Sequence, residues 1–334
     1  MNMYLFLIFV FFLSFSLIFL FKKISSLMNR TVDLHQSYAG NTNIPLIGGM
    51  VILFSMVLSS LYTTNSIIWF FAGMSLIGLF SDLKKLNSPI IRFLLQLFLI
   101  VFCVYSSDIL LDVTRITFLD YLLNNYYFSI IFTSFCILII VNGSNFIDGI
   151  NSLVIGYYIF ITIILLILKN DGFQISFNFP LNLLLLCLLV LFFFNLSNKL
   201  YLGDSGAYLL GFLFSIELIN FYLKNTISPF FIILLLWYPA FENLFSIMRK
   251  INIETSPLAP DTNHLHQLIF IFLKKKKYSL LKANNVTGIS INIYNGTIMM
   301  IAAINPTNTQ VQIILIILNL LIYTFFYMRL FKYK

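Results

Sequence analysis

The stretch FTSFCILIIVNGSNFIDGINSLVIGYYIF, Phe132 to Phe160, places a polar segment, Asn142 to Asn151, between two apolar runs. A membrane helix needs about 20 predominantly apolar residues, and both runs extend toward that length. Membrane hydrocarbon offers no partner for backbone hydrogen bonds, so apolar runs of this kind fold as helices. The stretch therefore predicts two membrane helices joined by a polar break.

The rest of the chain has the same character. Of its 334 residues, 60% are hydrophobic and 10% are charged, and the mean hydropathy is +0.95. This composition excludes an ordinary soluble globular domain. The three cysteines lie in apolar runs without metal-like or redox-like spacing, which predicts buried side chains. No internal repeat is visible, so we expect one membrane domain over residues 1–334, with a polar loop at about 246–285.

Apolar runs separated by polar breaks predict an all-α, polytopic membrane bundle of about ten to eleven transmembrane helices. The first run has lysines directly behind it and no basic residue ahead of it, so we expect a retained span rather than a signal peptide. The expected spans are residues 3–21, 45–63, 66–80, 89–107, 126–141, 152–168, 181–196, 206–223, 227–245, 286–304 and 309–328.

The basic residues are distributed unevenly among the connections. If these are numbered from the first, the odd ones and the C-terminal tail hold 17 of the 20 lysines and arginines. The other three are Arg115, Lys169 and Lys224. Cytoplasmic loops are rich in Lys and Arg, so the odd connections are expected to be cytoplasmic and the N-terminus outside. The polar residues Asp82, Asp148, Asp204, His264 and His266 all fall at odd connections, which predicts an active site on the cytoplasmic face.

Within the opening stretch, Asn142, Asn145, Asp148 and Asn151 recur at every third residue. In helical geometry, this spacing keeps the four side chains near one face of a helix end. A plain inter-helix turn is the alternative, because Asn, Asp and Gly suit turns. Polar clusters at membrane helix ends are costly unless they face a polar cavity or a ligand, which makes the segment a candidate binding site.

Two further segments carry chemistry on the same face. LYLGDSGAYLLGF puts Asp204 where a helix begins, either as an N-cap or as a metal-binding carboxylate beside backbone that a diphosphate can approach. HLHQ puts His264 and His266 two residues apart, without further zinc ligands, so phosphate oxygens are their expected partners. Together these groups suit a phosphate ester handled with a divalent ion, and the membrane location favours a lipid substrate.

At these residues the chain resembles the polyprenyl-phosphate N-acetylhexosamine-1-phosphate transferases, glycosyltransferase family 4, which include the phospho-N-acetylmuramoyl-pentapeptide transferase of peptidoglycan synthesis. The segments that carry the resemblance are IPLIGGM (44–50), GLFSDLKKLNSPIIRFLLQ (78–96), NGSNFIDGINSL (142–153), KLYLGDSGAYLLGF (199–212) and SPLAPDTNHLHQL (256–268). HLHQL and GINSL are more similar to the branch that uses UDP-N-acetylhexosamines for O-antigen, capsule or teichoic-type polymers. The resemblance implies a helical bundle in the bacterial cytoplasmic (inner) membrane.

The chain departs from the family pattern at several positions. Ser81 precedes Asp82 where the family has two aspartates, Asn151 replaces a later aspartate, and Gln267 replaces a third histidine. The first loop keeps Asp33 but lacks the usual Arg and His. If Ser81 marks a loss, the chain is a weak or inactive relative of the enzymes.

The resemblance implies transfer of N-acetylhexosamine-1-phosphate from a UDP-sugar, with UDP-N-acetylglucosamine the expected donor, to undecaprenyl phosphate, with release of UMP. This reaction would initiate synthesis of a cell-envelope polysaccharide. Mg²⁺, with Mn²⁺ as a substitute, is the implied metal. A transporter of an anionic solute is the alternative from another class, although transporter sites lie near the membrane midplane.

The resemblance also implies roles for individual residues. The expected metal ligands are Asp204 and Asp148. The expected catalytic residues are Asp82, Asp148, His264 and His266. The expected substrate-binding residues are Asn142, Asn145, Asn151, Lys199 and Arg249. The implied partners are the lipid phosphate, the UDP-sugar and the membrane, without nucleic acid, and a homodimer is left open.

Overall fold

The computed structural model describes residues 3–21, 44–60, 66–252, 254 and 263–333. The first expected cytoplasmic loop, with Asp33, and most of the SPLAPDTN segment lie outside these residues. The described chain folds almost entirely as helices, and its one β-bridge joins Leu46 and Tyr201. The helices are α1 (Met3–Phe21), α2 (Gly48–Ser60), α3 (Ile68–Asp82), α4 (Pro89–Ser107), α5 (Thr117–Leu123), α6 (Tyr126–Phe146), η3 (Ile147–Gly149), α7 (Leu153–Asn170), α8 (Leu181–Leu196), α9 (Gly203–Leu223), α10 (Pro229–Leu235), α11 (Trp237–Asn252), α12 (Leu265–Lys275), α13 (Leu280–Ala303) and α14 (Thr309–Phe331).

The predicted all-α, polytopic membrane fold is confirmed. Among the described residues, seven helical segments are long and apolar enough to cross a membrane: α1, α4, α6 with η3, α7, α9, α13 and α14. Three shorter apolar helices, α2, α3 and α8, occupy further predicted spans. The residues of the predicted span 227–245 form two helices, α10 and α11, which together are long and apolar enough for one span but meet at an angle of 79°.

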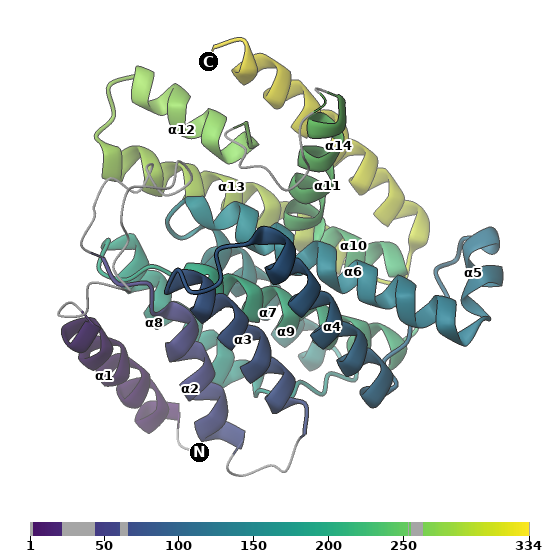
Figure 1. Ribbon diagram of the computed structural model, residues 1–334. Helices are drawn as coiled ribbons and strands as arrows, with labels where there is room; N and C mark the ends of the chain where they lie inside the picture. The colour runs from purple at the N-terminus through teal and green to yellow at the C-terminus, as the bar shows by residue number, and fades with distance from the viewer. Residues whose placement is uncertain (1–2, 22–43, 61–65, 253, 255–262, 334) are drawn as a thin grey trace.

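Helix α9 lies at the centre of the bundle (Figure 1). Its side chains are buried along nearly the whole helix, and α2, α3 and α6 pack against it. By contrast, α1, α4 and α14 expose large apolar side chains such as Phe12, Phe98 and Phe325. A membrane protein turns such surfaces toward lipid, so these three helices form part of the outer wall of the bundle.

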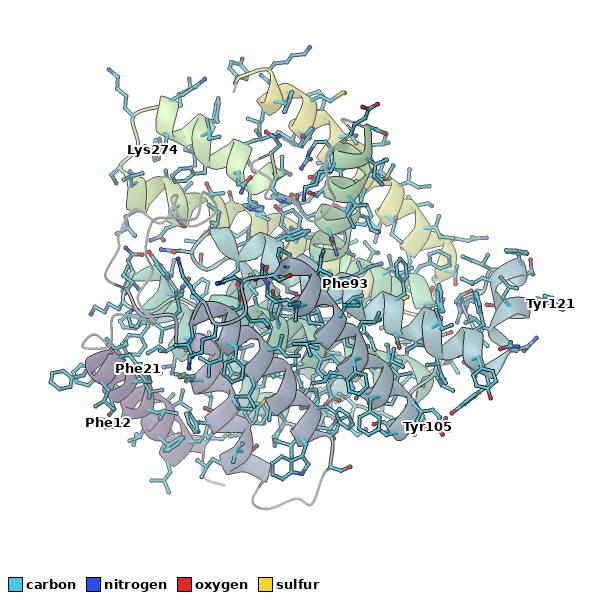
Figure 2. All side chains as sticks on the ribbon, in the orientation of Figure 1. Phe12, Phe21, Phe93, Tyr105, Tyr121 and Lys274 are labelled. Carbon is cyan, nitrogen blue, oxygen red and sulfur yellow. The ribbon has the colours of Figure 1, made fainter. Side chains whose placement is uncertain are left out.

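The ends of the helices gather at two opposite sides of the molecule. Figure 2 shows Lys274 and Phe21 on the left side of the molecule, and Tyr105 and Tyr121 on the right side. On the second side, the guanidinium of Arg115 donates hydrogen bonds to the carbonyl oxygens of Ile227 (2.9 Å) and Thr307 (3.3 Å). These contacts tie together connections that the sequence assigns to the outer side, while the assignment of inside and outside stays a prediction.

Close approaches between backbones fix how α2 and α3 cross the first turn of α9. A Cβ atom added at Gly78 of α3 would lie 2.4 Å from the Cα atom of Ser205. One added at Gly49 of α2 would lie 2.4 Å from the backbone nitrogen of Gly206. Asp82 follows Gly78 by about one helical turn and so lies on the same side of α3. Small residues at this crossing therefore bring Asp82 to the amino end of α9.

The substitution Gly78→Ala should destabilise the protein by about 1–3 kcal/mol, since overpacking a tight crossing forces backbone shifts. Gly73→Ala is the matched control in the same helix, because its Cβ would meet only the flexible end of the Leu99 side chain. Thermal unfolding in detergent is the measurement. Equal melting temperatures for the two variants would contradict the close crossing of α3 and α9.

Candidate active site

Asp82 caps the amino end of α9 from outside the helix. Its Oδ1 accepts a hydrogen bond from the backbone N–H of Asp204 at 2.9 Å, and its Oδ2 accepts one from that of Ser205 at 3.1 Å. The positive end of the helix dipole stabilises a carboxylate at this position. Gly203, with φ of +74°, leaves room for the carboxylate, since a Cβ there would lie 2.7 Å from Asp82 Oδ2. The N-cap role that the sequence left open for Asp204 therefore belongs to Asp82.

Asp204, freed from capping, is held by three side chains. Its Oδ1 accepts a hydrogen bond from Asn145 Nδ2 at 2.7 Å. Its Oδ2 accepts one from Ser81 Oγ at 2.6 Å and forms an ion pair with Arg92 Nη1 at 3.1 Å. Both members of the pair remain partly exposed, at 21% for Asp204 and 25% for Arg92. The site residue Asp204 thus lies where a ligand can reach it.

Asp148 completes a set of three neighbouring carboxylates. It lies on η3, is half-buried, and is within interaction range of the Gly203 backbone N–H and of the Asp82 and Asp204 carboxylates. The structure therefore brings together the acidic residues of three separate connections, which is the arrangement that the sequence predicts.

Asn142 and Asn145 lie on the last turns of α6, beside this set. Asn142 Nδ2 donates to Gln96 Oε1 of α4 at 3.2 Å and to the carbonyl oxygen of Leu138 at 3.0 Å. Asn145 contacts Asp204 as described above. Both amides therefore position neighbouring polar groups, and both remain half-buried rather than enclosed.

Asn151 does not continue the polar row. The 3₁₀ turn at Ile147–Gly149 and the left-handed backbone of Ser152, with φ of +65°, break the helical period before α7 begins. The Asn151 side chain is buried and donates to Asn198 Oδ1 at 3.1 Å, while its backbone N–H donates to Asn284 Oδ1 at 2.6 Å. The prediction that Asn151 shares one face with Asn142 and Asn145 is wrong, since Asn151 ties α7 to α13 and to the connection before α9.

The two histidines lie over a buried acid that the sequence interpretation missed. His264 Nδ1 is 2.8 Å from Glu242 Oε2, and the backbone N–H of Leu265 donates to Glu242 Oε1 at 3.1 Å. The ring of His266 stacks on that of His264, with centroids 5.3 Å apart, and its Nδ1 is 4.0 Å from Glu242 Oε1. Glu242 is fully buried on α11, within an apolar predicted span. An ionisable residue in such a span is a signal of function that could have identified it.

Phe146 links the histidines to the end of α6. Its ring lies 5.6 Å from that of His264, and Lys250 Nζ lies 5.6 Å from its ring centroid. Because Phe146 follows Asn145 in the chain, the histidine pair lies beside the helix end that contacts Asp204.

The two basic residues predicted to bind substrate lie in different surroundings. Arg249 Nη1 donates to Tyr327 Oη of α14 at 3.1 Å, and its guanidinium lies 5.3 Å from the ring centroid of Phe245. These contacts hold α11 against α14. Lys199 is exposed on the connection before α9. The binding roles of Arg249 and Lys199 stay predictions.

The side chains at the amino end of α9 suit a hard divalent cation. Mg²⁺ prefers oxygen ligands and is usually held by one or two protein carboxylates together with substrate phosphates. Asp148 and Asp204 offer such carboxylates. Among the described residues, no group of three His, Cys, Asp or Glu forms a dedicated metal cage. The arrangement fits a cation whose remaining ligands come from substrate and water.

A separate cavity of about 470 Å³ lies between α12 and α14. Its lining includes Phe272, Lys275, Lys276, Arg329 and Tyr333, and none of the three carboxylates. It is therefore distinct from the site at the end of α9.

Comparison with known proteins agrees with the geometry. A model of glycosyl transferase family 4 matches residues 64–222, which include Asp82, Asp148 and Asp204. Over these residues the chain is similar to glycosyl transferase family 4. The histidine pair and Glu242 lie beyond the matched residues.

Two curated proteins are also similar to the chain. The chain is 27% identical to the probable undecaprenyl-phosphate N-acetylglucosaminyl 1-phosphate transferase of Bacillus subtilis, over 71% of its own length and 68% of the relative. It is 25% identical to the undecaprenyl-phosphate alpha-N-acetylglucosaminyl 1-phosphate transferase of Thermotoga maritima, over 75% and 78% of the two chains.

The substitution Asp82→Asn should lower the free energy of unfolding of the protein by about 0.5–2 kcal/mol, the usual contribution of a helix cap. An amide can accept only with its oxygen, so one of the two backbone N–H groups would lose its acceptor. Asp112→Asn, on an exposed connection, is the control. Equal melting temperatures in detergent for the two variants would show that Asp82 does not cap α9.

Proposed function

We propose that the protein transfers N-acetylhexosamine-1-phosphate from a UDP-sugar, with UDP-N-acetylglucosamine as the expected donor, to undecaprenyl phosphate. The observation that carries this proposal is the convergence of Asp82, Asp148 and Asp204 at the amino end of α9. The names of the two relatives support the same substrates. The proposed setting is the bacterial cytoplasmic membrane with the site on the cytoplasmic face, where the product would start a cell-envelope polysaccharide such as O-antigen or capsule.

In the proposed reaction, a phosphate oxygen of undecaprenyl phosphate attacks the β-phosphorus of the UDP-sugar. A new P–O bond forms, the bond from the β-phosphorus to the bridging oxygen breaks, and UMP leaves. Both reactants are anions, so the main requirements are charge neutralisation and alignment. The second pKa of a phosphate monoester is about 6, so undecaprenyl phosphate is mostly dianionic at neutral pH. The reaction therefore needs no strong base to deprotonate it.

The residues of the site divide this work. Mg²⁺, or Mn²⁺ in its place, would be held by Asp204 and Asp148 and would neutralise charge on the diphosphate. Asn142 and Asn145 hold neighbouring groups in place and present amides to the nucleotide side. His264 and His266, oriented by Glu242, donate hydrogen bonds to phosphate oxygens as charge develops. Asp82 keeps the amino end of α9 in position, which favours an orienting role for its carboxylate over that of a base.

Membranes that contain the protein should release UMP from UDP-N-acetylglucosamine when undecaprenyl phosphate and Mg²⁺ are supplied. Asp204→Asn should lower this rate at least about 100-fold, the scale on which removal of one charge-stabilising group acts. Asp112→Asn should keep the wild-type rate. UMP added to the lipid product should drive the reaction backwards, because one diphosphate linkage replaces another.

Robust turnover by the Asp204→Asn variant would refute the metal assignment. Uptake of an anionic solute into vesicles, without any UDP-sugar chemistry, would favour the transporter. Absence of turnover in a well-folded wild-type protein would favour the inactive relative.

Glu242→Gln should lower turnover by on the order of 100-fold, because the histidine pair would lose the charge that orients it. Glu217→Gln is the matched control. Glu217 is also a buried glutamate in a membrane helix, but its Oε1 accepts from Asn178, away from the histidines. Steady-state rates and melting temperatures should be compared. If Glu217→Gln loses as much turnover as Glu242→Gln, Glu242 contributes to stability and not to the orientation of the histidines.

A further inference from the structure

Arg92 is a basic residue that contacts the carboxylate set through Asp204, and the sequence interpretation assigned it no role in the site. It lies on the first turn of α4, and its Nη1 donates to Ser81 Oγ at 2.6 Å and to Asp204 Oδ2 at 3.1 Å. Ser81 also donates to the same Asp204 oxygen. Arg92, Ser81 and Asp204 thus share one hydrogen-bonded junction.

The ion pair at this junction uses only one end of the guanidinium. Arginine binds carboxylate and phosphate most strongly through two parallel N–H···O bonds. Here a single nitrogen, Nη1, serves both Ser81 and Asp204. The Nε atom is buried and has no hydrogen-bond partner among the described residues. A buried donor without an acceptor is unfavourable, so this arrangement leaves part of the binding capacity of Arg92 unused.

The replacement of the family aspartate by Ser81 makes the junction easier to open. Ser81 is neutral, so Asp204 is the one acid that forms an ion pair with Arg92 in the described part of the chain. Both partners are partly exposed, and such ion pairs contribute little net stability. A second carboxylate at position 81 would hold the guanidinium more firmly.

We propose that Arg92 exchanges partners when substrate binds, a proposal that rests on the proposed function. In the free protein, the guanidinium neutralises Asp204 in place of a metal cation. When a nucleoside diphosphate and its divalent cation arrive, the cation takes over Asp204, and the guanidinium turns its unused edge toward phosphate oxygens. Arg92 is then both a placeholder for the metal charge and a binding residue for the diphosphate.

Binding to the purified full-length protein in detergent tests the exchange without turnover. Mn²⁺ binding is measured by electron paramagnetic resonance in the absence of nucleotide. Arg92→Ala should bind Mn²⁺ about fivefold more tightly than wild type, the equivalent of removing one partly exposed competing ion pair. Lys85→Ala, which removes an exposed lysine from the same connection, should bind Mn²⁺ as wild type does.

The second arm measures UDP-N-acetylglucosamine binding by calorimetry with Mn²⁺ present. Arg92→Ala should bind the nucleotide sugar at least about tenfold more weakly, because a charge-assisted hydrogen bond is lost. Arg92→Lys keeps the charge but not the planar fork, so it should bind Mn²⁺ as wild type does and the nucleotide sugar more weakly. This variant keeps the test decisive if the alanine variant does not fold.

Mn²⁺ affinity that is unchanged or weaker in Arg92→Ala than in Lys85→Ala would overturn the exchange. Wild-type affinity of Arg92→Lys for the nucleotide sugar would also overturn it. A wild-type protein that binds Mn²⁺ but no UDP-sugar would count against the proposed function, while the Mn²⁺ arm alone would still decide whether Arg92 competes for Asp204.

Discussion

The capping of α9 by Asp82 is the interaction on which the rest of the site depends. The first N–H groups of a helix have no partner within the helix, and a membrane interior supplies none. Asp82 satisfies two of these groups from α3, which requires the close crossing at Gly78 and the space left by Gly203. Because Asp82 takes the cap, Asp204 can turn its carboxylate toward Asn145 and Arg92. The amino end of α9 therefore joins α3 to α9 and also places the Asp204 carboxylate in the candidate site.

The same arrangement explains how three acidic residues can lie close together. Two of the charges have partners in this structure: backbone N–H groups for Asp82, and Arg92, Ser81 and Asn145 for Asp204. Asp148 has fewer hydrogen-bond donors near its carboxylate, and it lies close to the carboxylates of Asp82 and Asp204. Such a cluster attracts cations, and a cation is what two phosphate-bearing reactants need when they approach one another. The histidine pair over Glu242 supplies donors on the neighbouring side.

The sequence predicted the helices well because hydropathy and backbone hydrogen bonding alone determine them in a membrane. It also predicted that Asp82, Asp148 and Asp204 converge, through the order of the motifs and the distribution of lysine and arginine. The sequence did not predict features that depend on contacts between residues far apart in the chain. Arg92 and Asp204 are separated by 112 positions in the chain, and nothing local to either residue indicates their pairing. The side chain of Asn151 points away from Asn142 and Asn145 because a 3₁₀ turn interrupts the helix. The sequence around that turn resembles a continuous helix, so the interruption was not predicted. Glu242 was within reach of sequence reasoning, since a carboxylate in an apolar span needs a partner.

A structure of the protein with Mg²⁺ and UDP-N-acetylglucosamine bound, determined by cryo-electron microscopy, would test the central claim most directly. The account predicts that the diphosphate lies at the amino end of α9, between the carboxylates of Asp204 and Asp148 and the rings of His264 and His266. A diphosphate bound elsewhere, for example in the basic cavity between α12 and α14, would contradict it.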